Sequence, residues 1–209
     1  KGLSIIIPVF NEVDGIEDSI QDFKKLVSDQ KFSCEVIFVN DGSDDGTEVV
    51  LSNLDLDNES IKIINHKNNR GYGAALKTGI KNSKYDYIAI TDADKTYPND
   101  KIPSFYEIIL KEDHDMVVGA RVGKNVKIPI IRKPAKWFIN TLANYLSGVK
   151  IPDINSGLRV MRKSVLDKYI KILPDGFSFT TTITLAMLTN GYSVCYKKID
   201  YFHRSGSSK

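Results

Sequence analysis

The sequence contains 209 residues, enough for one sizeable hydrophobic core but short for two complete domains. Hydrophobic residues make up 42% of it and charged residues 26%, the proportions of an ordinary globular protein, so a disordered chain is excluded. The net charge of +3 is mild and by itself argues neither for nor against nucleic acid, which we do not expect as a partner.

No part of the sequence is typical of a secretion signal or a membrane span. The apolar run Leu3–Val9 is too short for a signal peptide, and no run approaches the roughly 18 apolar residues that cross a bilayer. We therefore expect any C-terminal membrane anchor to be absent from this chain. Cys34 and Cys195 lie in apolar, strand-like runs and are interpreted as free thiols in a reducing compartment, with a disulfide as the alternative.

The first 120 residues alternate short β-rich runs with amphipathic stretches. Because a strand covered on both faces is apolar throughout, Leu3–Val9 is typical of a buried strand, and Asp14–Ser28 carries apolar residues at helical spacing. The same patterns predict strands at 34–39, 61–64, 87–91 and 115–120, and helices at 47–54, 73–82 and 102–111. This alternation predicts an α/β fold with a mainly parallel central sheet and helices on both faces.

The second half of the chain loses this regularity. Residues 122–134 are basic and contain two prolines, which predicts an irregular loop. We expect helices at 135–147 and 180–190, and strands at 155–161 and 193–199. The segment Lys133–Leu146 joins a basic cluster to aromatic residues, which is typical either of a helix on an anionic membrane surface or of a helix packed on the core.

Polar and acidic residues follow three of the predicted strands, at 10–12, 40–43 and 92–94. Because ligands bind at the carboxyl ends of the strands in parallel sheets, we expect these segments to converge on one crevice. Asp92 and Asp94 offer hard oxygen ligands to Mg²⁺ or Mn²⁺ and leave coordination positions for a diphosphate, with an Asx-turn or helix cap as the alternative.

The segment after the second strand has two interpretations, which are compatible. Asp41 can accept a hydrogen bond from a nucleobase N–H, and we expect Asp44 or Asp45 to cap the next helix. Farther along, Gly71-Tyr72-Gly73 opens a predicted helix like a dinucleotide fingerprint. It does not follow the first strand and lacks the third glycine, which disfavours a Rossmann dehydrogenase.

Four motifs of the chain resemble those of family 2 glycosyltransferases and occur in the same order, at 7–12, 39–47, 69–75 and 91–94. Asn155–Arg159 and Arg204–Lys209 resemble the polyprenyl-phosphate branch, which includes dolichol-phosphate mannose and glucose synthases. The resemblance covers essentially the whole chain. It implies a GT-A fold and one catalytic domain, with a nucleotide-sugar half at 1–120 and an acceptor half at 121–209.

The resemblance also implies roles for individual residues. The residues expected to bind the nucleoside-diphosphate sugar are Pro8, Phe10, Glu12, Asp41, Gly73 and Asp92. Asp92 and Asp94 would hold a divalent metal, Mg²⁺ or Mn²⁺. Thr96 stands where the mannose synthases have a glutamine that helps to bind the metal, so water is the candidate for that position. The residues expected to act on the reacting groups are Asp94, Arg121, Arg132 and Arg204, the arginines receiving the lipid phosphate through bidentate contacts.

The implied reaction is sugar transfer from a nucleoside diphosphate to polyprenyl phosphate, undecaprenyl or dolichyl, with inversion and at the cytoplasmic face of a membrane. Because the phosphate oxygen is already anionic, a strong general base is not required, and no catalytic role is assigned to His66, His114 or His203. One alternative is a saccharide or protein hydroxyl as acceptor, with Asp153 as the candidate base. The other is a non-catalytic nucleotide-sugar-binding module.

Overall fold

The computed structural model describes residues 1–54, 60–122, 148 and 151–202. The described strands are β1 (Gly2–Val9), β2 (Ser33–Asn40), β3 (Ile61–Asn65), β4 (Tyr87–Ile90), β5 (Met116–Arg121), β6 (Arg159–Arg162) and β7 (Val194–Ile199). The described helices are α1 (Ile16–Ser28), α2 (Thr47–Asn53), α3 (Tyr72–Lys81), the short 3₁₀ helix η1 (Asn99–Lys101), α4 (Ile102–Lys111), α6 (Lys163–Tyr169) and α7 (Phe179–Thr189).

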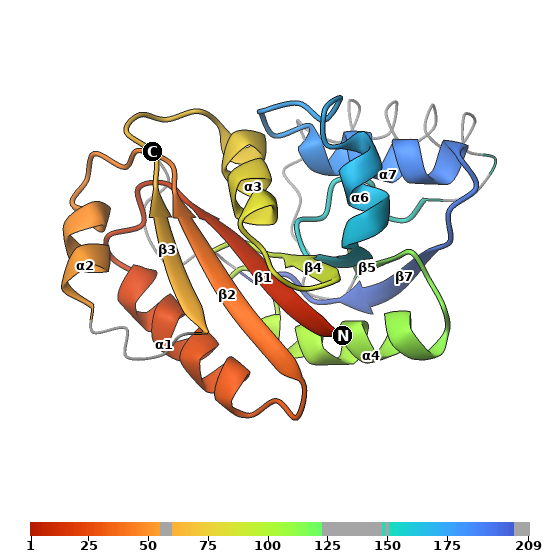
Figure 1. Cartoon of the computed structure of the whole chain (residues 1–209), viewed down its shortest axis with the longest axis horizontal. Coiled ribbons are helices and arrows are strands. Elements are labelled where there is room, and N and C mark those ends of the chain that lie inside the picture. The colour runs from red at the N-terminus through yellow and green to blue at the C-terminus, as the bar shows by residue number, and fades with distance from the viewer. Residues whose placement is uncertain (55–59, 123–147, 149–150, 203–209) are drawn as a thin grey trace.

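The described strands form one sheet in the order β3-β2-β1-β4-β6-β5-β7 (Figure 1). All neighbouring strands pair in parallel except β6, which is antiparallel to both β4 and β5. The mainly parallel sheet expected from the sequence is therefore confirmed. The antiparallel direction of β6 was not predicted, because the sequence pattern of a short strand does not specify its direction.

Helices cover both faces of the sheet, as expected. One hydrophobic core joins Ile5 and Ile7 of β1 to α1, α2 and α4, and a second joins Ile6 to α3, α6 and α7. All three isoleucines are fully buried because successive side chains of a strand point to opposite faces, and each face is covered. This double burial explains why the first strand is an unbroken apolar run.

Two elements differ from the sequence prediction. The strand expected at 155–161 is observed at Arg159–Arg162, because residues 155–158 are not paired in the sheet, and Asn155 and Gly157 line the cavity described below. Helix α6, only seven residues long, was not predicted, since it follows β6 directly without a glycine or proline between them. Most of the predicted loop 122–134 and all of the helix 135–147 lie outside the described residues.

The topology brings several chain segments to one edge of the sheet. Strands β1, β2, β4 and β5 all end there, and the antiparallel β6 begins there. Loops that are distant in the sequence thus meet in one place. Among the helices of the described ranges, none combines the length and the apolar character that a bilayer crossing requires.

Candidate active site

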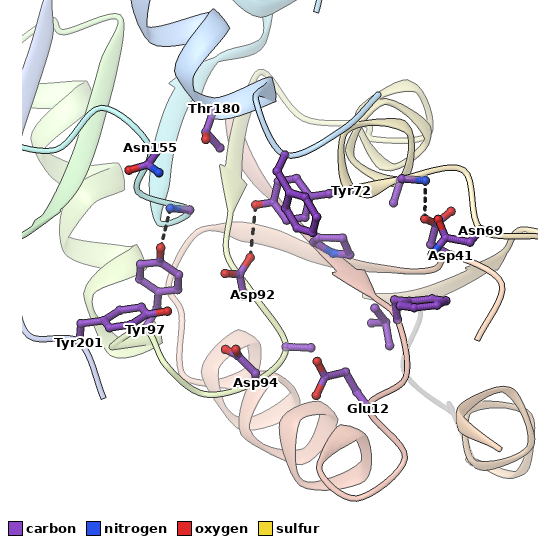
Figure 2. A pocket seen from close by; sticks show the side chains of 18 of the residues that line it. Glu12, Asp41, Asn69, Tyr72, Asp92, Asp94, Tyr97, Asn155, Thr180 and Tyr201 are labelled. Carbon is purple, nitrogen blue, oxygen red and sulfur yellow. Dashed lines mark hydrogen bonds between the residues drawn. The ribbon is translucent and has the colours of Figure 1, made fainter. Parts of the chain in front are cut away.

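A cavity of about 480 Å³ opens at this edge of the sheet (Figure 2). Its wall brings together seven residues that the sequence singled out, namely Pro8, Phe10, Glu12, Asp41, Asp92, Asp94 and Arg121. Seven further residues of the wall had no assigned role. Asn69, Tyr72, Asn155 and Gly157 lie in motifs that the sequence singled out, whereas Tyr97, Phe177 and Thr180 do not. The convergence of the three strand ends on one crevice is therefore observed in the structure.

The loops after β1 and β2 are fastened to each other by hydrogen bonds. The Asn11 side chain donates to a carboxylate oxygen of Asp44 at 2.8 Å, and the backbone N–H of Asp44 donates back to the Asn11 side chain at 3.0 Å. Asn11 adopts a positive φ of 54°, an uncommon conformation that these contacts hold in place. This wall of the cavity is thus fixed before any ligand arrives.

Helix α2 is capped as the sequence suggested, although not from the N-cap position. Gly46 occupies that position with a φ of 99°, and Asp45 accepts hydrogen bonds from the backbone N–H and the hydroxyl of Thr47. Thr47 in turn accepts a hydrogen bond from the backbone N–H of Glu12 at 3.0 Å. The cap therefore also positions the loop that carries Glu12.

Asp41 is 3% exposed, and its carboxylate accepts three hydrogen bonds within the protein. Its Oδ1 accepts from His66 Nδ1 at 2.7 Å and from the backbone N–H of Arg70 at 3.0 Å, while Oδ2 accepts from the N–H of Gly71 at 2.8 Å. The other ring nitrogen of His66 contacts Thr78 Oγ1 at 2.9 Å. A carboxylate offers about four acceptor positions, so one position on Oδ2 has no partner among the described residues.

Sequence reasoning gave His66 no role, yet it holds Asp41. The signal that could have found it is its place directly after β3, at the same edge of the sheet as Asp41. A buried imidazole at a strand end beside a carboxylate is a positioning group, because it fixes the carboxylate orientation without reaching the ligand itself.

The two aspartates after β4 are each oriented by a neighbouring hydroxyl. Tyr72 donates to Asp92 Oδ1 at 3.2 Å (Figure 2). The Thr96 hydroxyl donates to Asp94 Oδ1 at 2.7 Å. Thr96 also donates its backbone N–H to the same oxygen at 3.1 Å. Thr96, which stands where the mannose synthases have a glutamine, therefore holds one oxygen of the Asp94 carboxylate in place.

Charge and backbone geometry fix the loop that carries this pair. Lys95 adopts a φ of 57° and forms an ion pair of 2.8 Å with Asp22 of α1. The carboxylates of Asp92 and Asp94 are hard oxygen donors, and Glu12 lines the same crevice. Oxygen donors of this kind are the ligands that Mg²⁺ and Mn²⁺ prefer.

Tyr97 and Gly157 form the floor beside Asp92. The backbone N–H of Gly157 donates to the Tyr97 hydroxyl at 2.7 Å, and a Cβ at position 157 would lie 3.1 Å from the Tyr97 ring and 3.3 Å from Asp92 Oδ1. Burial first, and then the negative charge of Asp92, raise the pKa of both Tyr72 and Tyr97 above the usual phenol value. Both hydroxyls therefore stay protonated, and Tyr72 remains a donor to Asp92.

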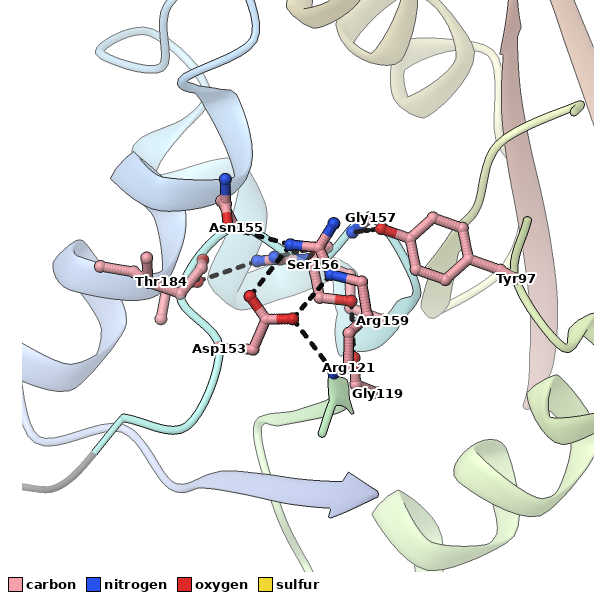
Figure 3. Close-up of polar contacts among 10 residues, drawn as sticks. Tyr97, Gly119, Arg121, Asp153, Asn155, Ser156, Gly157, Arg159 and Thr184 are labelled. Carbon is pink, nitrogen blue, oxygen red and sulfur yellow. Dashed lines mark hydrogen bonds and ion pairs between the residues drawn. The ribbon is translucent and has the colours of Figure 1, made fainter. Parts of the chain in front are cut away.

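Arg121, at the end of β5, is held in a bidentate ion pair (Figure 3). Its Nε and Nη2 donate to the two carboxylate oxygens of Asp153 at 2.7 and 3.0 Å, and Nη2 also donates to Asn155 at 3.0 Å. Burial alone would lower the pKa of Arg121, but its hydrogen bond to Asp153 and its electrostatic interactions with Tyr97, Asp153 and Tyr201 together outweigh that effect and raise the pKa. The two N–H groups of Nη1 have no partner among the described residues.

A second arginine, Arg159, is fully buried behind the cavity wall. It donates to the Ser156 carbonyl, to the Thr180 carbonyl at 3.0 Å and to the Thr184 hydroxyl at 2.9 Å (Figure 3). These contacts join the segment before β6 to helix α7. Arg159 thus keeps Asn155 and Thr180 in the wall of the cavity.

Gly73 lies outside the cavity wall, and its role as a donor-binding residue stays a prediction. A Cβ at Gly73 would lie 2.2 Å from the Pro174 carbonyl oxygen, and the next residue, Ala74, donates its N–H to the Asp175 carbonyl at 3.0 Å. The glycine therefore lets the segment before α7 pack against the start of α3. This contact places the ring of Phe177, which is 85% exposed, in a stack on Tyr72.

Arg132 and Arg204, the other two arginines expected to receive the acceptor phosphate, lie outside the described residues. The basic aromatic segment Lys133–Leu146 does so as well. Cys34 and Cys195 are free thiols, as expected, although only Cys34 is buried.

The family described as glycosyl transferase family 2 matches residues 4–170 of the chain. A prophage bactoprenol glucosyl transferase homolog of Escherichia coli K12 is 30% identical over 176 residues, which cover 83% of this chain and 56% of the relative. A dolichyl-phosphate hexose transferase of Haloferax volcanii is 26% identical over 208 residues, 99% of this chain and 86% of that protein. The chain thus spans little more than half the length of the bactoprenol relative.

Solved structures share the fold at lower sequence identity. Glucosyl-3-phosphoglycerate synthase from Mycobacterium tuberculosis, solved with Mn²⁺, uridine diphosphate and phosphoglyceric acid, superposes with a TM-score of 0.74. The two sequences are 18% identical, and the match covers 99% of this chain and 72% of the synthase. At this identity the likeness establishes a common fold.

Proposed function

The chain belongs to glycosyl transferase family 2 and has the GT-A fold that the sequence predicted, and from this premise we propose that it transfers a sugar from a nucleoside diphosphate to polyprenyl phosphate. The proposal includes dependence on Mg²⁺ or Mn²⁺, inversion at the anomeric carbon, and action at the cytoplasmic face of a membrane. The bactoprenol and dolichyl-phosphate transferases among the relatives support the acceptor class.

One observation carries the proposal, namely that the two halves of the reaction have matching groups in one cavity. Asp41 offers an acceptor position with no partner among the described residues, Asp92 and Asp94 lie between Asp41 and Asn155 (Figure 2), and Arg121 donates to Asn155. A nucleobase, a diphosphate and a second phosphate would require these groups in this order. Binding of a dinucleotide cofactor or of a nucleic acid would not require this combination of groups.

The donor would bind first to the fixed loops after β1 and β2. Pro8 and Phe10 give apolar surface for the nucleoside, and Asp41 accepts a base N–H. Asp92 and Asp94 would hold the divalent metal, which when bound supplies positive charge that offsets the charge gained by the departing diphosphate. Tyr72 and Thr96 keep these two carboxylates oriented while the diphosphate leaves.

The acceptor phosphate would bind through Arg121. Its Nη1 N–H groups are available to phosphate oxygens, while Asp153 and Asn155 hold the rest of the guanidinium still. A phosphate oxygen attacks the anomeric carbon as the bond from that carbon to the diphosphate breaks, so one C–O bond forms and one is lost. The attacking oxygen carries no proton at neutral pH, so no base has to remove one.

The alternative acceptor, a saccharide or protein hydroxyl, would require a general base. Asp153 was the candidate, but it is fully buried and both of its oxygens bind the Arg121 guanidinium. This engagement supports the phosphate acceptor, because an ion-paired carboxylate is a weaker base.

The test is a panel of radiolabelled UDP- and GDP-sugars incubated with the chain, Mn²⁺ or Mg²⁺, and undecaprenyl or dolichyl phosphate in detergent micelles. We expect metal-dependent transfer of label into the organic phase, and loss of that transfer in Asp94→Ala. Label moving only to a saccharide or protein hydroxyl would overturn the acceptor, and full activity of Asp94→Ala would overturn the site. A chain that binds sugar nucleotides without turnover would be a binding module.

A further inference from the structure

A cluster of metal-binding side chains lies at the opposite edge of the sheet from the cavity. Glu112 and His114 belong to the turn between α4 and β5, and Cys195 is the second residue of β7. Strand β5 separates His114 from Arg121, so at about 3.3 Å per residue the cluster lies roughly 20 Å from the candidate active site. Nothing in the proposed transfer reaction uses these residues.

The three donor atoms are close enough to share one ion. A carboxylate oxygen of Glu112, a ring nitrogen of His114 and the thiol sulfur of Cys195 all lie within 4.8 Å of one another. His114 Nε2 is 3.1 Å from Glu112 Oε2. Tetrahedral Zn²⁺ with bonds of about 2.0 Å to nitrogen and oxygen separates such ligands by about 3.3 Å, so this pair already has the required spacing.

A further hydrogen bond prepares His114 for coordination through Nε2. Its other ring nitrogen, Nδ1, is 2.6 Å from the hydroxyl of Ser193, which can accept an N–H as readily as it donates an O–H. Ser193 is itself fixed, because its backbone N–H donates to Asp115 Oδ2 at 3.0 Å. Histidines that bind metals usually donate their second ring N–H to such a partner.

Glu112 is the acid beside His114 that a cation would bind. Asp113 and Asp115 pair with Arg162, whereas the ion pair of Glu112 with a base is the longer one to Lys197. Lys197 Nζ lies 3.9 Å from Glu112 Oε2 and is the group that a bound ion would displace. The side chains of Glu112 and Lys197 are 50% and 38% exposed, so the displaced lysine ammonium group can move into solvent.

We propose that Glu112, His114 and Cys195 bind one thiophilic divalent cation, with water as the fourth ligand, and that this cation is Zn²⁺. A thiolate, an imidazole and a carboxylate form a donor set that favours Zn²⁺ over Mg²⁺ or Mn²⁺. Binding releases the thiol proton of Cys195 and links the turn after α4 to the edge strand β7. The site is chemically and spatially separate from Asp92 and Asp94.

Cobalt substitution tests the proposal without any measurement of transfer. Titrating the reduced chain with Co²⁺ should give one equivalent of a thiolate-to-cobalt charge-transfer band, which Zn²⁺ should then displace. Cys195→Ser should abolish the band, and Ser193→Ala should weaken Co²⁺ binding about 10- to 100-fold. Cys34 is a matched control, because its burial raises the pKa of that thiol to about 12 and Cys34→Ala should leave the band intact.

The outcomes separate this site from the candidate active site. Asp94→Ala should retain the charge-transfer band at full stoichiometry, whatever happens to transfer. No band in the unmodified chain, or a band that persists in Cys195→Ser, would overturn the proposal. Loss of the band in Asp94→Ala would also overturn it, since coordination by the Cys195 thiolate would then depend on the acidic pair and the two sites would not be separate.

Discussion

Asp41 has one hydrogen-bond acceptor position without a partner among the described residues, and the N3–H group of uracil is the donor that would fill it. Methylation of N3 removes that donor. Three of about four acceptor positions on this buried carboxylate are filled by His66, Arg70 and Gly71. Uracil presents a single N–H on the edge that would meet Asp41, whereas guanine presents two adjacent N–H donors. We therefore expect UDP to bind more tightly than 3-methyl-UDP or GDP.

The size of the preference follows from the cost of a buried polar group without a partner. That cost is about 1–3 kcal/mol, which corresponds to a factor of about 5 to 160 in affinity. Guanine would leave one of its two N–H groups unpaired beside Asp41. 3-Methyl-UDP would leave the acceptor position of Asp41 empty and bring a methyl group against a side chain that is 3% exposed.

Isothermal titration calorimetry in the presence of Mn²⁺ measures these affinities directly. 5-Methyl-UDP is the matched control, because it carries the same extra methyl group but keeps the N3 hydrogen. The affinity for 5-methyl-UDP should be close to that for UDP, whereas 3-methyl-UDP and GDP should bind about 5- to 160-fold more weakly than UDP or more weakly still. Equal affinities for UDP and 3-methyl-UDP, or tighter binding of GDP than of UDP, would refute the count of acceptor positions on Asp41.

Three other predictions concern the support of the site and the core. Thr96→Val removes the hydroxyl that orients Asp94, so the metal concentration for half-maximal transfer should rise about 10- to 100-fold, with Thr96→Ser as the control that restores it; an unchanged metal requirement would contradict the role of this contact. Arg121→Lys cannot form the bidentate pair with Asp153, so steady-state kinetics should show KM for polyprenyl phosphate rising about tenfold while KM for the donor stays unchanged; a selective rise of the donor KM would place Arg121 on the other substrate. Burial raises the pKa of Cys34 from 9.0 to about 12, so the stabilising contribution of the neutral thiol is complete below pH 9 and is lost as the pH rises from 9 to 12, by about 1.4 kcal/mol per pH unit. Urea denaturation should therefore show that the unfolding free energy of Cys34→Ala declines less steeply over that range than that of the unmodified chain. Parallel curves for the two chains would argue against a buried neutral thiol.

Most of the first half of the fold could be predicted because its signals are local. The strand at Gly2–Val9 and the helix at Ile102–Lys111 are observed within about one residue of their predicted bounds. Apolar runs and helical spacing are properties of neighbouring residues, so they survive in the folded state. The direction of β6 depends instead on which strands flank it, which no local pattern specifies.

The acidic pair and Asp41 could be found from the sequence because each follows a recognisable strand. The contacts that orient them could not. His66 reaches Asp41 across 25 positions of the chain, and Gly157 reaches Tyr97 across 60. Such pairs are set by the order of strands in the sheet, and a single sequence carries no signal for that order. Thr96 shows the reverse case. Its hydrogen bond to Asp94 joins residues two positions apart, but the sequence was interpreted only as placing water where the mannose synthases have a glutamine.

The ion pair between Arg121 and Asp153 has a consequence for how enzymes of this architecture can diverge. It ties together the two points where the chain leaves and re-enters the sheet edge, so the stretch of sequence between them begins and ends at a fixed base. When the ends of a stretch are fixed in this way, doubling its length adds only about 0.6 kcal/mol of closure entropy. A change in the length of the sequence between these two residues therefore carries a small entropic cost, and the strand register and the loops after β1 and β2 can stay the same.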